Sequence, residues 1–197
     1  MTAEFSYPEG ATPLDPDDIE GLRFKHITTR AELDHLEQGN IESGLEWLKR
    51  ARKVNVLDER FLRKLHNKLF GEVWNWAGGF RTTEKNIGVE PVQIPIQLRL
   101  LLDDAMYWVE HETYPAKEIA LRFHHRLVKI HLFTNGNGRH ARIAADLLLM
   151  RDLKSAPIDW TAGQDLQVLT PRRTEYISAL RAADAHDYDP LLKFGNE

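Results

Sequence analysis

The chain has 197 residues, no cysteine and a formal net charge of −4 at pH 7. The missing cysteines exclude a disulfide-stabilised domain, and the negative charge argues against general nucleic-acid binding, which needs a basic face. The sequence contains neither an apolar run of about 18 residues nor a basic segment followed by an apolar stretch near its start. We therefore expect no membrane association and a cytoplasmic location.

The first 40 residues differ in character from the rest of the chain. Residues 1–20 hold three prolines and several acidic side chains, so we expect an extended arm. Within residues 21–40, a short acidic helix is predicted to begin near Thr28 and to end at Gly39 and Asn40. This segment is a candidate for an inhibitory helix, and residues 41–197 are expected to form one domain.

That domain is predicted to be mostly helical. Apolar residues recur at helical spacing over several segments that are joined by short connections, namely residues 42–53, 58–76, 97–111, 116–131, 137–152 and 171–184. Residues 78–95 instead combine turn formers with short β-branched runs, which indicates a small β-hairpin. The expected fold class is therefore all-α with one hairpin.

A glycine-rich segment that begins at His131 holds the residues best suited to chemistry. Gly136 and Gly138 allow an oxyanion to approach the backbone N–H groups, and the helix predicted to follow adds unpaired N–H donors. Arg139 and Arg142 are three residues apart, so both can face one polyphosphate from neighbouring turns. His131 is the natural general base, because its ordinary pKa lies near neutrality.

Each residue type also has an ordinary structural explanation. A single histidine is often structural, a Gly-Asn-Gly run is usually a turn, and a pair of arginines is usually a solvated helix face. The three features in this order favour a phosphate site with a general base over those separate explanations.

The segment resembles the signature of the Fic family, written His-Pro-Phe-x-Asp/Glu-Gly-Asn-Gly-Arg-x-x-Arg. The matching residues are His131, Phe133, Gly136, Asn137, Gly138, Arg139 and Arg142. The resemblance covers roughly residues 40–194, since residues 65–78 look like the early core helix of the family and residues 176–180 and 188–192 also look familiar. The subgroup that the chain most resembles is called mobile mystery protein B.

The resemblance implies a Fic-type helical bundle with a β-hairpin flap, and a protein adenylyltransferase that moves AMP from ATP to a Ser, Thr or Tyr hydroxyl of a target protein. His131 would be the catalytic base. The residues implied to bind the nucleotide are Asn135, Gly136, Asn137, Gly138, Arg139, Arg142 and Tyr176. The flap residues Lys85, Asn86, Ile87 and Gly88 would dock the target, unless the segment is an ordinary connecting loop. Self-modification and a homo-oligomer stay open as alternatives.

Many Fic proteins carry an inhibitory helix with the pattern Ser/Thr-x-x-x-Glu-Gly/Asn. The resemblance implies that Glu37 or Glu32 plays this part by pairing with the second arginine of the signature, Arg142. A solvated helix face is the alternative explanation for either glutamate.

Two positions depart from the family signature. Leu132 replaces proline, which removes a restraint on the backbone but still permits the same path. Asn135 stands where the family has an acidic Mg²⁺ ligand, and its amide oxygen carries no net charge to offset the metal. The alternatives are weak Mg²⁺ binding at Asn135 with a slow enzyme, transfer of UMP or phosphate, or a nucleotide- or partner-binding regulatory module with weak or no catalysis.

Overall fold

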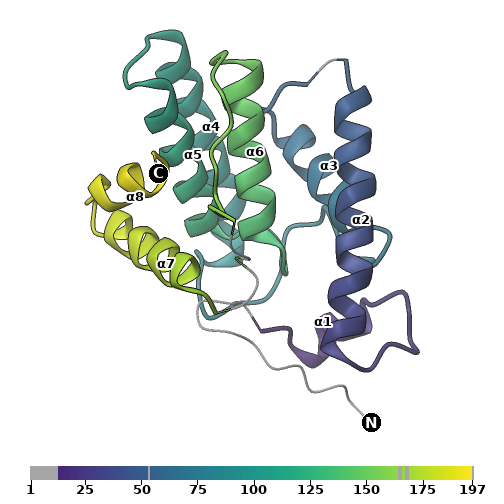
Figure 1. Cartoon of the computed structure of the whole chain (residues 1–197). Coiled ribbons are helices and arrows are strands. Elements are labelled where there is room, and N and C mark those ends of the chain that lie inside the picture. The colour runs from purple at the N-terminus through teal and green to yellow at the C-terminus, as the bar shows by residue number, and fades with distance from the viewer. Residues whose placement is uncertain (1–12, 53, 164–165, 167–168, 197) are drawn as a thin grey trace.

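The computed structural model describes residues 13–52, 54–163, 166 and 169–196, and these residues form helices joined by loops (Figure 1). Within these ranges the only β-type pairing is an isolated bridge between Leu22 and Trp74, so the predicted all-α class is confirmed. In chain order the elements are α1 (Pro16–Glu20), α2 (Arg30–Arg50), α3 (Glu59–Phe70), the 3-10 turn η1 (Pro91–Gln93), α4 (Ile94–Glu110), α5 (Ala116–Ile130), α6 (Asn137–Arg151), α7 (Pro171–Asp184) and α8 (Asp189–Phe194).

Helix α2 does not end where the sequence predicted. It begins after the N-cap Thr29 and continues through Gly39 and Asn40 to Arg50. The side chain of Asn40 is buried and donates to the carbonyl of Lys68 at 3.0 Å, while its oxygen accepts from the N–H of Glu72 at 2.8 Å. Asn40 therefore joins α2 to the end of α3 instead of stopping the helix. The predicted boundary between the segment 21–40 and the domain 41–197 therefore falls inside α2.

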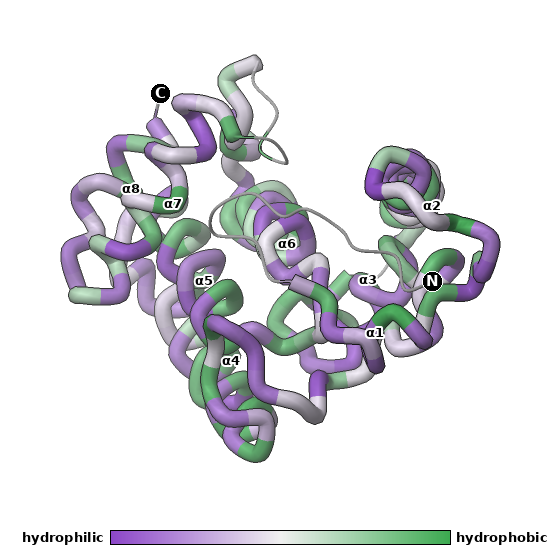
Figure 2. The backbone as a smooth tube through the Cα atoms, turned by 90° about the horizontal axis from the view of Figure 1, so that it is seen from below, coloured by the Kyte–Doolittle hydropathy of each residue, from purple (hydrophilic) through white to green (hydrophobic). Residues whose placement is uncertain are grey.

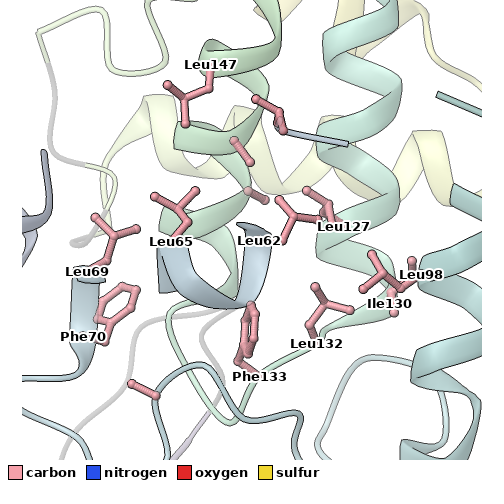
Figure 3. Close-up of a cluster of buried hydrophobic side chains, with 14 of the residues drawn as sticks. Leu62, Leu65, Leu69, Phe70, Leu98, Leu127, Ile130, Leu132, Phe133 and Leu147 are labelled. Atoms are coloured by element: carbon pink, nitrogen blue, oxygen red, sulfur yellow. The ribbon is translucent and has the colours of Figure 1, made fainter. Parts of the chain in front are cut away.

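Helix α6 lies at the centre of the arrangement (Figure 2). It packs against α5 and α3, while α2 covers the outer side of α3 and α4 covers α5. One group of buried apolar side chains joins α2 to α6, and a second joins α5 and α6 to α7 and α8. Side chains of α3, α5 and α6 meet in the first group, where Phe133 lies below Leu62 (Figure 3).

The β-hairpin predicted within residues 78–95 is not formed. Residues 80–90 have no strand pairing, and η1 follows them directly. Their hydrogen bonds run to another part of the chain, because the N–H of Arg81 donates to Leu132 at 3.0 Å and that of Val89 donates to Ile130 at 3.4 Å. A segment anchored in this way to the end of α5 cannot also pair with itself. We call residues 80–90 the flap loop.

The N-terminal arm was predicted over residues 1–20, of which residues 1–12 lie outside the described residues. Within residues 13–20 the chain forms the short helix α1, whose Pro16 occupies the first turn, instead of an extended arm. Asp15 and Asp18 of this region pair with Lys85, so the segment lies against the flap loop.

Among the described residues, none of the helices has the length and apolar character that spanning a membrane requires.

Candidate functional site

His131 lies directly after the last residue of α5. Its backbone is left-handed, with φ of 58° and ψ of 66°, and its N–H still donates to Leu127 at 3.1 Å. The side chain is buried, and burial followed by the positive charges of Arg81 and Lys85 lowers the pKa of His131 to about 4. The imidazole is therefore neutral at pH 7 and able to accept a proton.

The loop after His131 is held by the side chain of Asn137. Its amide nitrogen donates to the carbonyl of Phe133 at 2.7 Å, and its oxygen accepts from the N–H of Phe133 at 2.9 Å. The ring of Phe133 is fully buried and stacks on His66 with 3.7 Å between ring centroids. The sequence placed Asn137 among the nucleotide-binding residues. In the structure its side chain closes the loop by hydrogen bonds to both backbone groups of Phe133.

His66 of α3 supports the same loop and was not identified from the sequence. The N–H of Gly78 donates to its Nδ1 at 3.0 Å, which leaves the proton on Nε2 to be donated to the carbonyl of Asn135, also at 3.0 Å. Burial lowers the pKa of His66 well below its ordinary value. His66 stands at a position of the helix that follows the apolar pattern, and the sequence gives no signal that separates support of the loop from simple packing at such a position.

Gly136 is the N-cap of α6 and requires glycine. Its φ is +76°, and a Cβ at this position would lie 2.8 Å from the ring of Phe70. The helix begins at Asn137, so its first N–H groups open onto the loop and offer donors to an anion. The anion cradle that the sequence predicted at this position stays a prediction.

Arg139 forms a buried ion pair with Glu37. Its Nη2 lies 2.7 Å from Oε2 of Glu37, whose Oε1 accepts from the indole Nε1 of Trp74, also at 2.7 Å. Glu37 is only 3% exposed, which excludes the alternative of a solvated helix face for this residue. The partner differs from the expected one, because Glu37 pairs with the first arginine of the signature and not with Arg142. The side chain of Glu37 on α2 reaches Arg139 in the first turn of α6.

Arg142 approaches Tyr176 of α7 instead. Its guanidinium carbon lies 5.5 Å from the centroid of the tyrosine ring. The hydroxyl of Tyr176 is 2.9 Å from Nε2 of His124, and burial raises the pKa of this hydroxyl. This contact places Tyr176 beside Arg142, another of the residues predicted to bind the nucleotide.

A single pocket of about 520 Å³ joins these elements. His131, Asn135, Gly136, Asn137, Gly138, Arg139, Arg142 and Tyr176 all line it, so the structure brings together every residue predicted for catalysis and nucleotide binding. Further cations line it as well, and the sequence did not single them out: Arg30, Lys129, Arg173 and Arg181. Among the described lining residues the one carboxylate is that of Asp184, so the cations outnumber it and give the pocket a strongly positive character, which suits a polyphosphate.

The flap residues divide into two groups. Ile87 and Gly88 line the pocket, and Ile87 is 41% exposed. Asn86 is exposed. The side chain of Lys85, however, is only 2% exposed, because its ammonium pairs with Asp18 and lies 2.6 Å from Asp15. Lys85 therefore holds α1 against the flap loop and does not face outward.

Glu32, the other candidate for an inhibitory residue, caps α2. Its carboxylate accepts from the hydroxyl of Thr29 at 2.8 Å and from the N–H of Thr29 at 3.1 Å. These hydrogen bonds lower the pKa of Glu32. Glu32 is exposed and is not among the described residues that line the pocket.

The side chains of the site do not fit a metal held by the protein. Among the described residues, no group of three or more His, Asp or Glu side chains could hold a metal ion. Asn135 is neutral, and its Oδ1 accepts from the N–H of Gly136 at 2.6 Å, which directs this oxygen into the loop. The position expected to ligate Mg²⁺ therefore stabilises the glycine turn.

Comparisons with known proteins agree with this geometry. Residues 56–149 match the model of the Fic/DOC family. The chain is 33% identical over 138 residues to a protein adenylyltransferase Fic of Drosophila grimshawi, covering 66% of this chain and 26% of that protein. It is 34% identical over 125 residues to protein adenylyltransferase fic-1 of Caenorhabditis elegans, covering 60% of this chain and 22% of that protein. The chain thus spans about a quarter of the length of these curated relatives.

Solved structures show the same fold. The BepC protein of Bartonella tribocorum, crystallised with bound AMPPNP, has a TM-score of 0.68 at 17% identity, over 96% of this chain and 94% of that one. The N-terminal Fic domain of Bep8 from Bartonella sp. 1-1C has a TM-score of 0.68 at 15% identity, over 88% of this chain and 87% of that one. Together with the loop that begins at His131, these findings show a domain of the Fic/DOC family at residues 56–149.

Proposed function

We propose that the chain is a protein adenylyltransferase that transfers AMP from ATP to a Ser, Thr or Tyr hydroxyl of a target protein. The observation that carries the proposal is one pocket that holds a neutral buried histidine, two arginines and the start of a helix. Curated relatives named protein adenylyltransferase support the reaction type, and the AMPPNP in the BepC structure supports a nucleotide as donor.

The reaction assigns one task to each part of the site. The hydroxyl oxygen of the target attacks the α-phosphorus of ATP while His131 takes the hydroxyl proton. The bond from the α-phosphorus to the bridging oxygen breaks, and pyrophosphate leaves with the electron pair of that bond. Arg139, Arg142 and the N–H groups of Asn137 and Gly138 hold the phosphates and balance the charge that develops on them.

We further propose that Glu37 restrains this activity. Its carboxylate occupies the guanidinium that the phosphates of ATP would otherwise bind, and Trp74 holds the carboxylate in place. A phosphate must displace Glu37 from Arg139 before the donor can bind fully. Because the displaced carboxylate is buried, this competition lowers the affinity for ATP.

No step of this reaction is assigned to a metal held by the protein, because Asn135 is turned into the loop. The arginines and the further cations of the pocket supply the positive charge for the phosphates. Any Mg²⁺ would enter with the donor and keep most of its water ligands.

The orientation of Asn135 also supports a second candidate function. A site without an acidic residue at this position fits a module that binds a nucleotide or a partner with little or no catalysis, or one that uses another donor, such as UTP for UMP transfer or ATP for phosphate transfer. A buried neutral histidine at the pocket favours the adenylyltransferase, since binding alone does not require a general base.

The test compares the wild-type chain, Glu37→Gly and His131→Ala with ATP, Mg²⁺ and a cell lysate. Label from α-³²P-ATP on protein, lost in His131→Ala, would support AMP transfer, and label from γ-³²P-ATP would indicate phosphate transfer instead. His35→Ala is a matched control, because His35 is exposed on α2. If the wild-type chain binds ATP but transfers no label from α-³²P-ATP, γ-³²P-ATP or α-³²P-UTP to protein, the binding module is favoured. Labelling of the chain itself would identify self-modification.

A further inference from the structure

Arg81 lies under the loop that carries His131 and is only 3% exposed. Its Nε donates to the carbonyl of His131 at 2.6 Å, and its Nη1 donates to that of Thr83 at 3.0 Å. Its Nη2 donates to the carbonyl of Val89 and, at 3.4 Å, to that of Ile130. One guanidinium thus binds the end of α5 and both ends of residues 83–89.

The end of α5 needs such a partner. The last carbonyls of a helix accept no hydrogen bond from within the helix. A cation near them is favourable because of the helix dipole. His131 also departs from the helix with a positive φ of 58°, which a side chain with a Cβ adopts only when its surroundings hold it there. The hydrogen bond from Arg81 to the carbonyl of His131 fixes the peptide that follows this strained residue.

The flap loop closes against the same place. Gly88 has a φ of +109°, and a Cβ there would lie 2.6 Å from both the Cβ of His131 and Nη2 of Arg81. Only glycine permits this approach. The N–H of Val89, the next residue, donates to Ile130 at 3.4 Å, so the backbone of the flap loop and the end of α5 are joined beside Arg81.

We propose that Arg81 is a positioning residue that fixes the backbone of His131 and holds Gly88 of the flap loop over it. The inference rests on the proposed function, because it assigns to His131 the part of the base. Arg81 acts through the carbonyls of Ile130, His131, Thr83 and Val89 and does not line the pocket. It therefore governs the orientation of the imidazole and leaves the phosphate-binding arginines unchanged.

The proposal predicts a local effect on the backbone and an effect on the rate alone, whereas a purely structural arginine would change the whole domain and the ATP affinity as well. Loss of the guanidinium should loosen the flap loop and the end of α5 but not the distant turns of α6. It should also lower the rate at saturating ATP without weakening the binding of ATP. Lysine is the sharpest replacement, because it keeps the charge near His131 but cannot reach the carbonyls of both segments with a planar fork of donors.

The experiment measures amide hydrogen exchange and labelling by α-³²P-ATP in the wild-type chain and in Arg81→Lys. We expect exchange at the N–H of Val89 to rise at least tenfold and that at Ala145 of α6 to stay unchanged. The labelling rate at saturating ATP should fall at least tenfold, with ATP affinity within twofold of the wild type. Arg99→Lys is the matched control, because Arg99 is exposed on α4.

The inference is overturned if exchange at Val89 stays at the wild-type rate, if exchange at Ala145 rises equally, or if labelling is unchanged despite faster exchange at Val89. If the wild-type chain labels no protein, the proposed function fails, and the exchange rates alone decide whether Arg81 fixes this junction. If Arg81→Lys does not fold, Gly88→Ala decides by the same two measurements, because its Cβ would meet both the Cβ of His131 and Nη2 of Arg81 and so separate the flap loop from this junction.

Discussion

The carboxylate of Glu37 lies 2.7 Å from the guanidinium of Arg139, and the indole of Trp74 holds the other carboxylate oxygen at the same distance. The pair joins α2 to the first turn of α6, where Arg139 lines the pocket. Under the proposed function, a phosphate and this carboxylate would compete for one guanidinium, and the pair would adjust the affinity for the donor.

Glu37→Gln should raise that affinity. The substitution removes the charge but keeps an oxygen for Trp74, so Arg139 becomes available to a phosphate. We expect the Kd for ATP to fall about tenfold, which corresponds to about 1.4 kcal/mol. Isothermal titration calorimetry with ATP measures the change.

The control is Glu42→Gln, because Glu42 is exposed on the same helix and accepts a hydrogen bond from the side chain of Gln38. Equal ATP affinities for Glu37→Gln and the wild type would contradict the restraint proposed for Glu37.

Asn135→Asp should make the site responsive to Mg²⁺. A carboxylate at this position supplies the charge that an amide lacks, and it can turn from the N–H of Gly136 toward a metal. We expect labelling by Asn135→Asp to fall at least tenfold when EDTA is added, and that of the wild type to change less. If both proteins respond to EDTA alike, residue 135 does not set the metal dependence.

Asn40→Ala should destabilise the fold without changing the pocket. It removes the hydrogen bonds to Lys68 and Glu72, and the backbone groups left behind are partly buried. We expect the free energy of unfolding to fall by about 2 kcal/mol, measured by urea denaturation. Gln38→Ala, which is exposed on the same helix, should change this free energy by less than about 0.5 kcal/mol.

Mild acid should unfold the protein through its buried histidines. Burial lowers the pKa of each of them below the unfolded value of 6.5, to about 3 for His124 and to about 4 for His131 and His140, with His66 also lowered. Between pH 6.5 and 4 the unfolded chain therefore binds more protons than the folded one. The stability is fully present above pH 6.5 and is lost as the pH falls, by about 1.4 kcal/mol per pH unit for each such histidine.

Urea denaturation at pH 7, 6 and 5 measures this slope. Asp146 and Asp152 have pKa values raised by burial, so they act in the opposite direction at the acid end of the range. A His140→Gln variant that folds should show a smaller slope, and exposed His35→Gln should show the slope of the wild type. A free energy of unfolding that does not change from pH 7 to pH 5 would contradict the prediction.

The sequence predicted the helices of the domain well because apolar residues recur at helical spacing along the face of each helix that is buried. The segment 171–184 agrees with α7, and 116–131 and 137–152 each end one residue after the observed helix. The break predicted at Gly39 and Asn40 was wrong, since those residues often end helices but here Asn40 bonds to α3. Local composition cannot reveal a partner that is 28 residues away.

The same limit applies to the site. The residues from His131 to Arg142 were found because their order along the chain is itself the signal. Arg81, His66 and Trp74 were missed in their present roles, because each acts on a loop or side chain that is distant in sequence. The hairpin was predicted from turn formers and β-branched residues, whereas hydrogen bonds to the end of α5 determine the path of the flap loop.

The continuity of α2 has a consequence for how the site could be switched on. Glu37 is placed one turn before Asn40, in a helix of 21 residues that packs against the 12 residues of α3. Removing the carboxylate by unwinding the helix would break the contact between Asn40 and α3 and would draw on the stability of the whole domain. Exchange of one anion for another at Arg139 avoids that penalty. If Glu37 restrains the activity as proposed, the restraint would depend on donor concentration, and α2 would not have to unwind.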